Sequence, residues 1–459
     1  MTNSAIDTRY VTMVASGAAL GGFLFGFDTS TMNAAITGIR STLELSSAQV
    51  GLVAAISLIG AAIGAWFAGP VAARFGRNRV MFIAGALITL GALAFSLTSQ
   101  MVLLGLFRLM VGLGIGSASA VVPAYIVEIS PPAIRGRLGS LWQFAIVIGQ
   151  LLGLLAGYGL TRWAGSEAAP LFFGAAAWRW MFAVVALLAA GYVFISRLLP
   201  QTPEDLIRYG HENDARALLS RIGGVTVEEE IASISEELGK ESRVATLKDL
   251  RGSKFGLKAL VWVGILLAVF QQLVGINVVK TYSNALWRLV GFSTGASFTI
   301  SIITVLVSIA STMVAIVIID MVGRRAMLLS GAGMMAMALG TLAVCFCTAT
   351  GSGDDIVLTR RAAITALIAI NVFSVAFGVT WGPVMWVMLG ELFAGNLRTV
   401  AVAVCTAANW ITNWAVTRTF PLLAGIGLGF VYGLYSAFAV LAFVFVLKAL
   451  PETKGRAIT

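Results

Sequence analysis

The chain has 459 residues, of which 58% are hydrophobic and only 11% are charged. A soluble protein carries about 25% charged residues, so this composition excludes a soluble globular protein and indicates that the chain is surrounded by lipid. The net charge of +10 does not indicate a nucleic-acid partner, because the basic residues lie at the ends of apolar runs and in polar loops, as membrane topology requires.

Twelve apolar runs follow one another, and each is long enough to cross a bilayer at about 20 residues per crossing. They lie near residues 11–37, 48–72, 80–98, 101–127, 138–161, 173–199, 259–287, 295–319, 326–349, 362–390, 400–420 and 424–447. The pattern predicts an all-α membrane protein with twelve transmembrane helices. The first run is too long for a signal-peptide core and has no small-residue cleavage site, so we expect it to be retained. The basic residues of the tails and the long central loop favour cytosolic termini.

The first run contains Asp28, which is the only acidic residue in the interior of any apolar run. A charge there costs from about 3 to over 10 kcal/mol, so it needs a partner or a water-filled cavity. Helical rise places Asp28 about 15 Å and Arg108 of the fourth run about 10 Å below the outer face, so the two side chains are able to meet. If the protein carries protons, Asp28 is the only credible carrier. The alternative is a static ion pair that holds two helices together.

Several later runs carry amide or indole side chains at similar depth. They are Gln143 and Gln150 in the fifth run, Gln271, Gln272 and Asn277 in the seventh, Trp381 and Trp386 in the tenth, and Asn409, Trp410 and Asn413 in the eleventh. Amides offer donors and acceptors that match hydroxyl groups, and an indole offers a flat apolar face for a sugar ring. A single amide is more often a contact between helices. As a set, these residues favour a neutral, polyhydroxylated ligand.

Residues 200–258 form the only long polar stretch. Glu228–Glu230 precede Ile231, Ile234 and Leu238 at helical spacing, which predicts short amphipathic helices at the membrane surface. Such helices serve either as a latch between two halves or as a solvated linker. The predicted division is a six-helix bundle over 1–199, a cytosolic linker over 200–258, and a second bundle with a cytosolic tail over 259–459.

Lys280, in the seventh run, either snorkels outward along its methylene stem or faces the interior and competes for Asp28. The three cysteines, Cys345, Cys347 and Cys405, lie in apolar runs, where small core residues are favoured over a disulfide or a metal site. The sequence contains no nucleophile–base set, metal-ligand cluster or phosphate loop. We therefore expect neither an enzyme, a metal nor a cofactor.

One charged signature occurs twice, about half the chain apart. RFGRNR at 74–79 returns as MVGRR at 321–325, Glu128 with Arg135 returns as Glu391 with Arg398, and PQTP at 200–203 returns as PETK at 451–454. Three pairs in the same order indicate an internally duplicated chain. Duplication combined with bilayer-length segments is typical of secondary transporters.

Four segments resemble the sugar porter family of the major facilitator superfamily. They are GFLFGFD at 22–28, QQLVGIN at 271–277, WGP at 381–383 and PETKGR at 451–456. The resemblance implies two pseudo-symmetric six-helix bundles, a central sugar site and alternating access. Bacterial proton-coupled members carry an aspartate at the position of Asp28, near an arginine matching Arg108, whereas the human glucose facilitators lack that acid. The resemblance therefore favours symport.

The same resemblance implies two sets of functional residues. The implied sugar contacts are Phe25, Gln143, Gln150, Gln271, Gln272, Asn277, Trp381, Asn409 and Trp410. The implied cytosolic gate is the ion-pair network of Arg77, Glu128, Arg135, Asp320, Arg324, Glu391 and Arg398.

The chain departs from the family pattern at both places. Near the sugar site the departures are Lys280, Thr281, Ser308 and Asn409. On the cytosolic side they are Ala73, Asn78, Val185, Gln201, Glu204, Ala394 and Thr399. Acids and bases are lost mainly from the first half, so we expect an eroded first-half gate and a bias towards the inward-open state.

The sequence thus predicts a monomeric, multi-pass protein of the cell (plasma or inner) membrane that couples protons to the uptake of a neutral sugar (hexose or pentose) or cyclitol. Asp28 is the expected proton carrier, with Arg108 and Lys280 modulating it. One alternative is a facilitator in which Lys280 permanently neutralises Asp28. Another is a sugar sensor that binds ligand without transport.

Overall fold

The computed structural model describes residues 7–223, 226–240, 247–252, 256–281, 294–349, 358–393 and 395–454. Within these ranges the chain is helical apart from loops and one isolated bridge between Pro170 and Ala176. Twelve helical spans are long and apolar enough to cross a membrane. This confirms the predicted all-α, twelve-span architecture.

Six spans form the group of helices that begins the chain. They comprise α1 (Thr8–Thr42), α2 (Ser47–Phe75), α3 (Arg77–Leu97), α4 (Met101–Glu128), the fifth span with η1 (Pro132–Ile134), α5 (Arg135–Gly139) and α6 (Leu141–Ala164), and α7 (Ala177–Leu198). Within this group α1 packs on α6, α2 on α4, and α3 on α4 and α7. Gly26 and Gly149 permit the close approach of α1 and α6, because a Cβ on Gly26 would collide with the Ile146 carbonyl and one on Gly149 with the Phe23 carbonyl.

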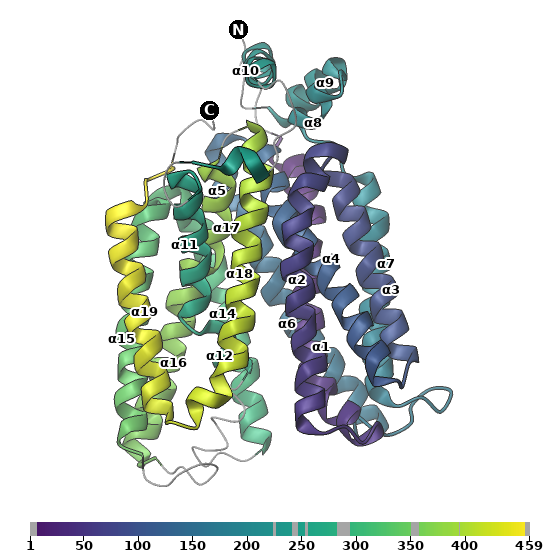
Figure 1. Ribbon diagram of the computed structural model, residues 1–459, viewed down its shortest axis with the longest axis vertical. Helices are drawn as coiled ribbons and strands as arrows, with labels where there is room; N and C mark the ends of the chain where they lie inside the picture. The colour runs from purple at the N-terminus through teal and green to yellow at the C-terminus, as the bar shows by residue number, and fades with distance from the viewer. Residues whose placement is uncertain are drawn as a thin grey trace.

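The other six spans follow the linker. They comprise α11 (Ala259–Leu273) with α12 (Ile276–Thr281), α14 (Thr294–Val322), α15 (Arg324–Cys347), α16 (Arg360–Val379) with α17 (Trp381–Leu392), α18 (Gly395–Ala424) and α19 (Leu428–Ala449). Figure 1 shows the two groups side by side, the first in purple and blue and the second in green and yellow. The seam between them is formed by α18 against α2 and α4, α14 against α5 and α6, and α17 against α4, α5 and α6.

Two spans that the apolar runs predict as continuous are broken. The seventh breaks at Gly275, whose φ of 79° lies in the left-handed region, and the tenth breaks at Thr380, with φ −121° and ψ −85°. A glycine tolerates such a backbone without strain, and a Cβ there would collide with the Tyr435 ring. Hydropathy averages over a whole run and so does not register one non-helical residue.

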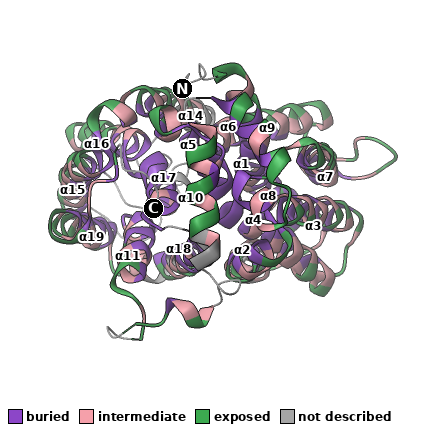
Figure 2. Cartoon of the chain, turned by 90° about the horizontal axis from the view of Figure 1, so that it is seen from above, coloured by how far each residue is buried: buried purple, intermediate pink, exposed green. Residues whose placement is uncertain are grey.

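The polar stretch folds into α8 (Pro203–Arg208), α9 (Glu212–Ile222), α10 (Val227–Lys240) and η2 (Leu247–Leu250). This confirms the predicted short helices, with Ile231 buried and the glutamates of α10 in its first turn. The start of α1 lies at this end too, since the Asp7 amide donates to the Ile222 carbonyl. We call it the linker end. Figure 2 shows α10 lying over the seam and running along it, and it packs on α8 and α9 of the linker and on α18 of the second half.

Candidate functional site

Asp28 and Arg108 form an ion pair between α1 and α4. Arg108 Nη1 lies 2.6 Å from Asp28 Oδ1, and each side chain is only 3% exposed. Arg108 Nη2 also donates to the Ser57 hydroxyl of α2 at 3.2 Å. The guanidinium stands 5.9 Å from the ring centre of Phe95 and 5.8 Å from that of Phe182. Thus the predicted meeting of the two side chains is confirmed, in a setting where each charge depends on the other.

Four of the predicted amides form one hydrogen-bonded cluster where α11, α12 and α18 meet. Gln272 Nε2 donates to Asn409 Oδ1 at 3.1 Å, and Asn277 Nδ2 donates to Gln272 Oε1 at 2.8 Å. Asn409 Nδ2 donates to Gln271 Oε1 at 2.9 Å, while Gln271 Nε2 donates to the Trp381 carbonyl at 3.1 Å. The break at Gly275 turns the chain so that Asn277 faces the amides of the preceding helix.

Trp410 joins this cluster to the first half of the chain. Its indole N–H donates to the Ser119 hydroxyl of α4 at 2.9 Å, and its ring meets that of Phe25 edge to face, with centroids 5.0 Å apart. Phe25 and Asp28 are three residues apart on α1, so they lie one turn from each other. One helix therefore carries both the acid of the ion pair and a ring that contacts the opposite half.

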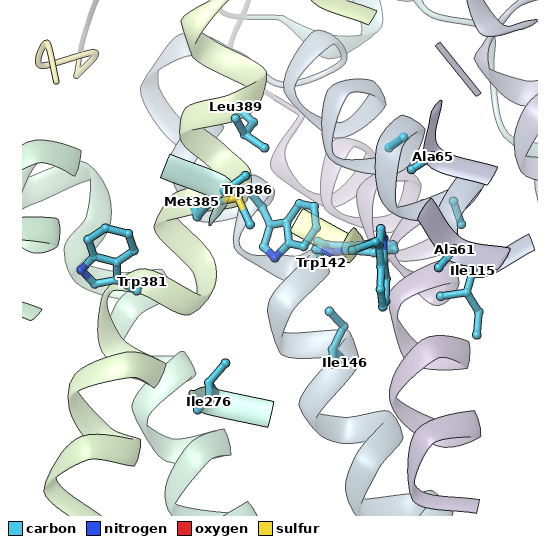
Figure 3. Close-up of a cluster of buried hydrophobic side chains, with 14 of the residues drawn as sticks. Ala61, Ala65, Ile115, Trp142, Ile146, Ile276, Trp381, Met385, Trp386 and Leu389 are labelled. Carbon is cyan, nitrogen blue, oxygen red and sulfur yellow. The ribbon is translucent and has the colours of Figure 1, made fainter. Parts of the chain in front are cut away.

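A second aromatic pair closes the seam nearer the linker end. Trp142 of α6 and Trp386 of α17 point toward each other in Figure 3, and their ring centroids lie 6.0 Å apart. Trp381 stands apart from this pair in the same view, and its indole N–H donates to the Leu328 carbonyl of α15 at 2.9 Å. Gln143, next to Trp142, is buried and faces Gly382 across the seam, and Gln150 lies two turns further along the same helix, half buried.

At the linker end, Arg77 is surrounded by carboxylates. Arg77 lies 2.5 Å from Glu128, 2.6 Å from Asp205 and 3.3 Å from Glu204, and its own side chain is fully buried. The backbone N–H of Arg77 also donates to Asp205 at 3.2 Å. We call these four residues the first-half latch.

The second half repeats the arrangement around Arg324. Arg324 lies 2.7 Å from Glu391 and 3.0 Å from Asp320. The backbone N–H groups of Arg324 and Arg325 donate to Glu452 at 3.1 and 3.0 Å. Arg324, Asp320, Glu391 and Glu452 are the second-half latch.

Each latch also contacts a residue of the opposite half, and these contacts join the halves. Arg398 of α18 reaches Glu128 at 3.5 Å and Glu204 at 3.8 Å. In the opposite direction, Asp320 of α14 accepts a hydrogen bond from the Arg137 backbone N–H of α5 at 2.9 Å. Arg135 is half-buried among these groups, within electrostatic reach of Glu391. The halves are therefore held together at the linker end.

The expectation of an eroded first-half gate is wrong. Asn78, in place of the family arginine, donates to the Leu199 and Pro200 carbonyls at 2.7 and 3.1 Å, as Arg325 does to the Leu447 carbonyl at 2.7 Å. Arg77 has its full set of carboxylates although Ala73 and Gln201 carry none. Sequence comparison position by position misses this, because the acids come from neighbouring positions on α8.

Several partners were not predicted. Ser57, Ser119, Glu204, Asp205, Glu452 and Thr453 each contact one of the predicted residues. Glu204 and Asp205 could have been found from the sequence, since two adjacent acids follow Pro203 directly beyond a membrane span. The serines had none, because serine is common inside membrane helices.

Two predictions cannot be placed. The side chains of Lys280 and Thr281 lie outside the described residues, so the two readings of Lys280 stay predictions. Cys345 and Cys405 are buried, as expected for core residues, whereas Cys347 is exposed.

Comparisons with known proteins extend over almost the whole chain. The family model described as sugar (and other) transporter matches residues 14–459. A glucose transport protein of Synechocystis is 39% identical over 457 residues, which is 99% of this chain and 97% of the relative.

Solved structures match the whole fold. A proton:xylose symporter bound to 6-bromo-6-deoxy-D-glucose superposes with a TM-score of 0.86 at 29% identity, covering 98% of both chains. The inward-open conformation of the xylose transporter from Escherichia coli gives 0.71 at 30% identity, again over 98% of both chains.

Proposed function

Because this chain belongs to the sugar (and other) transporter family, we propose that it is a proton-coupled symporter that takes up a neutral sugar or cyclitol by alternating access. Its relatives are transporters, and the chain is a multi-pass membrane protein and not an enzyme. The substrate class and the coupling to protons are the proposed part.

The observation that carries the proposal is the position of the Asp28–Arg108 pair. It is buried in the membrane-spanning part, one helical turn from Phe25, whose ring contacts Trp410 beside the amide cluster. An ion pair with a purely structural role can lie anywhere between two helices. An ion pair that couples proton binding to transport has to be linked by contacts to the ligand site. The proton:xylose symporter that matches the fold supports the same reading.

The residues suggest how coupling works. With Asp28 ionised, Arg108 is bound to both Asp28 and Ser57, and this ties α1 and α2 to α4. Protonation of Asp28 removes the charge that Arg108 neutralises, so the tie between α1 and α4 weakens. A sugar held by Gln271, Gln272, Asn277 and Asn409 would contact Trp410, whose ring in turn contacts Phe25. The same helix then responds to proton and sugar together.

We place the linker end in the cytosol, with both termini, and take the two bundles (1–199 and 259–459) as the bodies that move. The gate is then the pair of latches with Arg135 and Arg398. Opening towards the cytosol has to separate Arg398 from Glu128 and Glu204, and Asp320 from Arg137. The small number of these contacts suits a gate that opens and closes, since a few kcal/mol of bias decide a two-state equilibrium.

The test compares two kinds of sugar flux in proteoliposomes, for the wild type and Asp28→Asn. We expect the wild type to accumulate sugar only with an inward proton gradient. Asp28→Asn should lose accumulation and keep counterflow, in which sugar exchanges for sugar without a net proton. The matched control is Asp214→Asn on α9, where an exposed acid is removed far from the pair.

Each other outcome excludes the proposal in a definite way. Wild-type uptake that ignores the gradient makes the protein a facilitator. Loss of both accumulation and counterflow in Asp28→Asn, with normal folding, makes the ion pair structural. Sugar binding without counterflow in the wild type makes the protein a sensor.

A further inference from the structure

The two latches contain the same number of carboxylates but take them from different places. Arg324 and its backbone N–H are bound by Glu391, Asp320 and Glu452. Arg77 and its backbone N–H are bound by Glu128, Asp205 and Glu204. Only Glu128 and Glu391 occupy equivalent positions in the duplicated sequence. The other two acids of the first half have no counterpart at the matching positions.

The matching positions are easily found. Asp320 precedes Arg324 by four residues, and the residue four before Arg77 is Ala73. Glu452 is the third residue after α19 ends at Ala449, and the third residue after α7 ends at Leu198 is Gln201. Ala73 has no charge, and Gln201 is exposed. Both acids of the second half are therefore missing from the first.

The acids that replace them lie on α8. Asp205 is 1% exposed, with one carboxylate oxygen 2.6 Å from Arg77 Nη1 and the other accepting the Arg77 backbone N–H. Glu452 likewise accepts backbone N–H groups at the start of α15. Glu204 adds a contact to Arg77 and reaches Arg398 across the seam, as Asp320 reaches α5.

We propose that Asp205 and Glu204 replace the acids missing at Gln201 and Ala73. The linker helix α8 thereby completes the first-half latch and helps to keep the linker end closed. In the second half the corresponding acids belong to α14 and to the chain just after α19. In the first half they belong to the linker, which continues into α9 and α10. Asp205 and Glu204 are positioning residues for transport, because they act through Arg77 and the gate and not on the sugar.

Two features favour this assignment over a chance contact. Thr202 accepts the Asp205 backbone N–H at its hydroxyl and so fixes the start of α8. Arg208, at the end of α8, donates to Glu204 at 2.9 Å and to the Ala73 carbonyl at 3.2 Å. The backbone of Asp205 and the side chain of Glu204 are thus held by contacts other than those with Arg77. Ala73, where an acid is missing, is itself in contact with α8.

The test is a rescue experiment that needs neither sugar nor a proton gradient. The reporter is Val387→Cys, at a fully buried position on α17 facing Gly139 of α5, in a chain whose native cysteines are replaced by alanine. The rate of thiol labelling then reports how often the linker end opens. We expect Asp205→Asn to raise this rate about tenfold, because one partner of a buried charge pair is lost.

The second variant moves the acid to the position that matches the acid of the second half. Gln201→Glu in the Asp205→Asn background should return labelling to near the wild-type rate, and Ala73→Asp should do the same for Glu204→Gln. If Asp205→Asn folds poorly, restored folding in the double variant supports the proposal equally. Asp214→Asn on α9 serves as the control.

Unchanged labelling in Asp205→Asn overturns the proposal. Raised labelling or poor folding that Gln201→Glu does not correct also overturns it, because the loss is then a general loosening of α8. The result is independent of the proposed function, since a facilitator with the same latches gives the same labelling.

Discussion

At the scale of single residues, several polar side chains of the candidate site have partners within the protein. Asp28 has Arg108, Gln272 has Asn409 and Trp410 has Ser119. This is expected where unpaired polar groups cost several kcal/mol. Under the proposed function, it also means that a sugar has to exchange hydrogen bonds with amides that already bind one another. Ligand hydroxyls can do this because each donates and accepts.

The contact between Trp410 and Ser119 tests this reasoning. Trp410→Phe keeps a ring beside Phe25 and removes the N–H, so we expect a loss of about 0.5–1.5 kcal/mol, seen as a lower melting temperature and weaker counterflow. Ser119→Ala leaves the indole N–H unpaired and should cost at least as much. The double variant should cost no more than Ser119→Ala alone. Additive losses in this cycle would mean that the two side chains act separately.

At the scale of elements, the interruptions in the seventh and tenth spans are decisive. Each separates a long helix from a shorter one, and the residues next to both breaks belong to the amide cluster or contact it. Broken helices are where membrane transporters expose backbone and side chains to a ligand. A continuous seventh helix would turn Asn277 away from Gln272.

Gly275 is the residue on which the first break depends. Gly275→Ala places a Cβ in the left-handed region and against Tyr435, so we expect a destabilisation of about 1–3 kcal/mol and a loss of counterflow. Gly159→Ala is the matched control, because this helical glycine has open space around it and should gain stability by up to about 1 kcal/mol. Equal melting temperatures for the two variants would contradict a break that requires glycine at this position.

At the scale of the whole molecule, charges at the linker end hold the halves together. Burial by itself would raise the pKa of Glu204, but the guanidiniums of Arg77, Arg398 and Arg208 outweigh it and hold that pKa below the ordinary value of 4.5. The pKa of Glu452 is also lowered: burial opposes this, but four backbone N–H groups bind its carboxylate. Both carboxylates therefore stay ionised at any physiological pH.

The direction of the Glu204 shift fixes a pH dependence. The folded form has the lower pKa, so the stabilisation is fully present above the ordinary value and is lost as pH falls through the folded value. We expect the melting temperature of the purified protein to be insensitive to this group above about pH 5 and to fall in more acidic buffer. The Glu204→Gln variant should have a lower melting temperature at neutral pH, and its melting temperature should fall less steeply in acidic buffer. Parallel curves for the two proteins would show that Glu204 does not contribute.

The sequence by itself indicated the number of spans, the duplication and the amphipathic linker, and it placed Asp28 and Arg108 at depths that allow them to meet. These follow from short-range rules, since bilayer thickness sets the length of a span and helical rise sets the depth of a charge. The amides and indoles of the site were also visible, because polar side chains are rare and costly in lipid.

Tertiary structure alone decided which of those residues touch. The fold brings the Ser119 hydroxyl to the indole N–H of Trp410, and it directs the indole N–H of Trp381 to a carbonyl of α15. It also brought Glu204 and Asp205 to Arg77, where matching positions in the sequence show alanine and glutamine. A buried guanidinium requires carboxylates within about 4 Å but does not require them at a given place in the chain. Carboxylates from any part of the chain can satisfy this requirement, so only the folded protein shows which ones do.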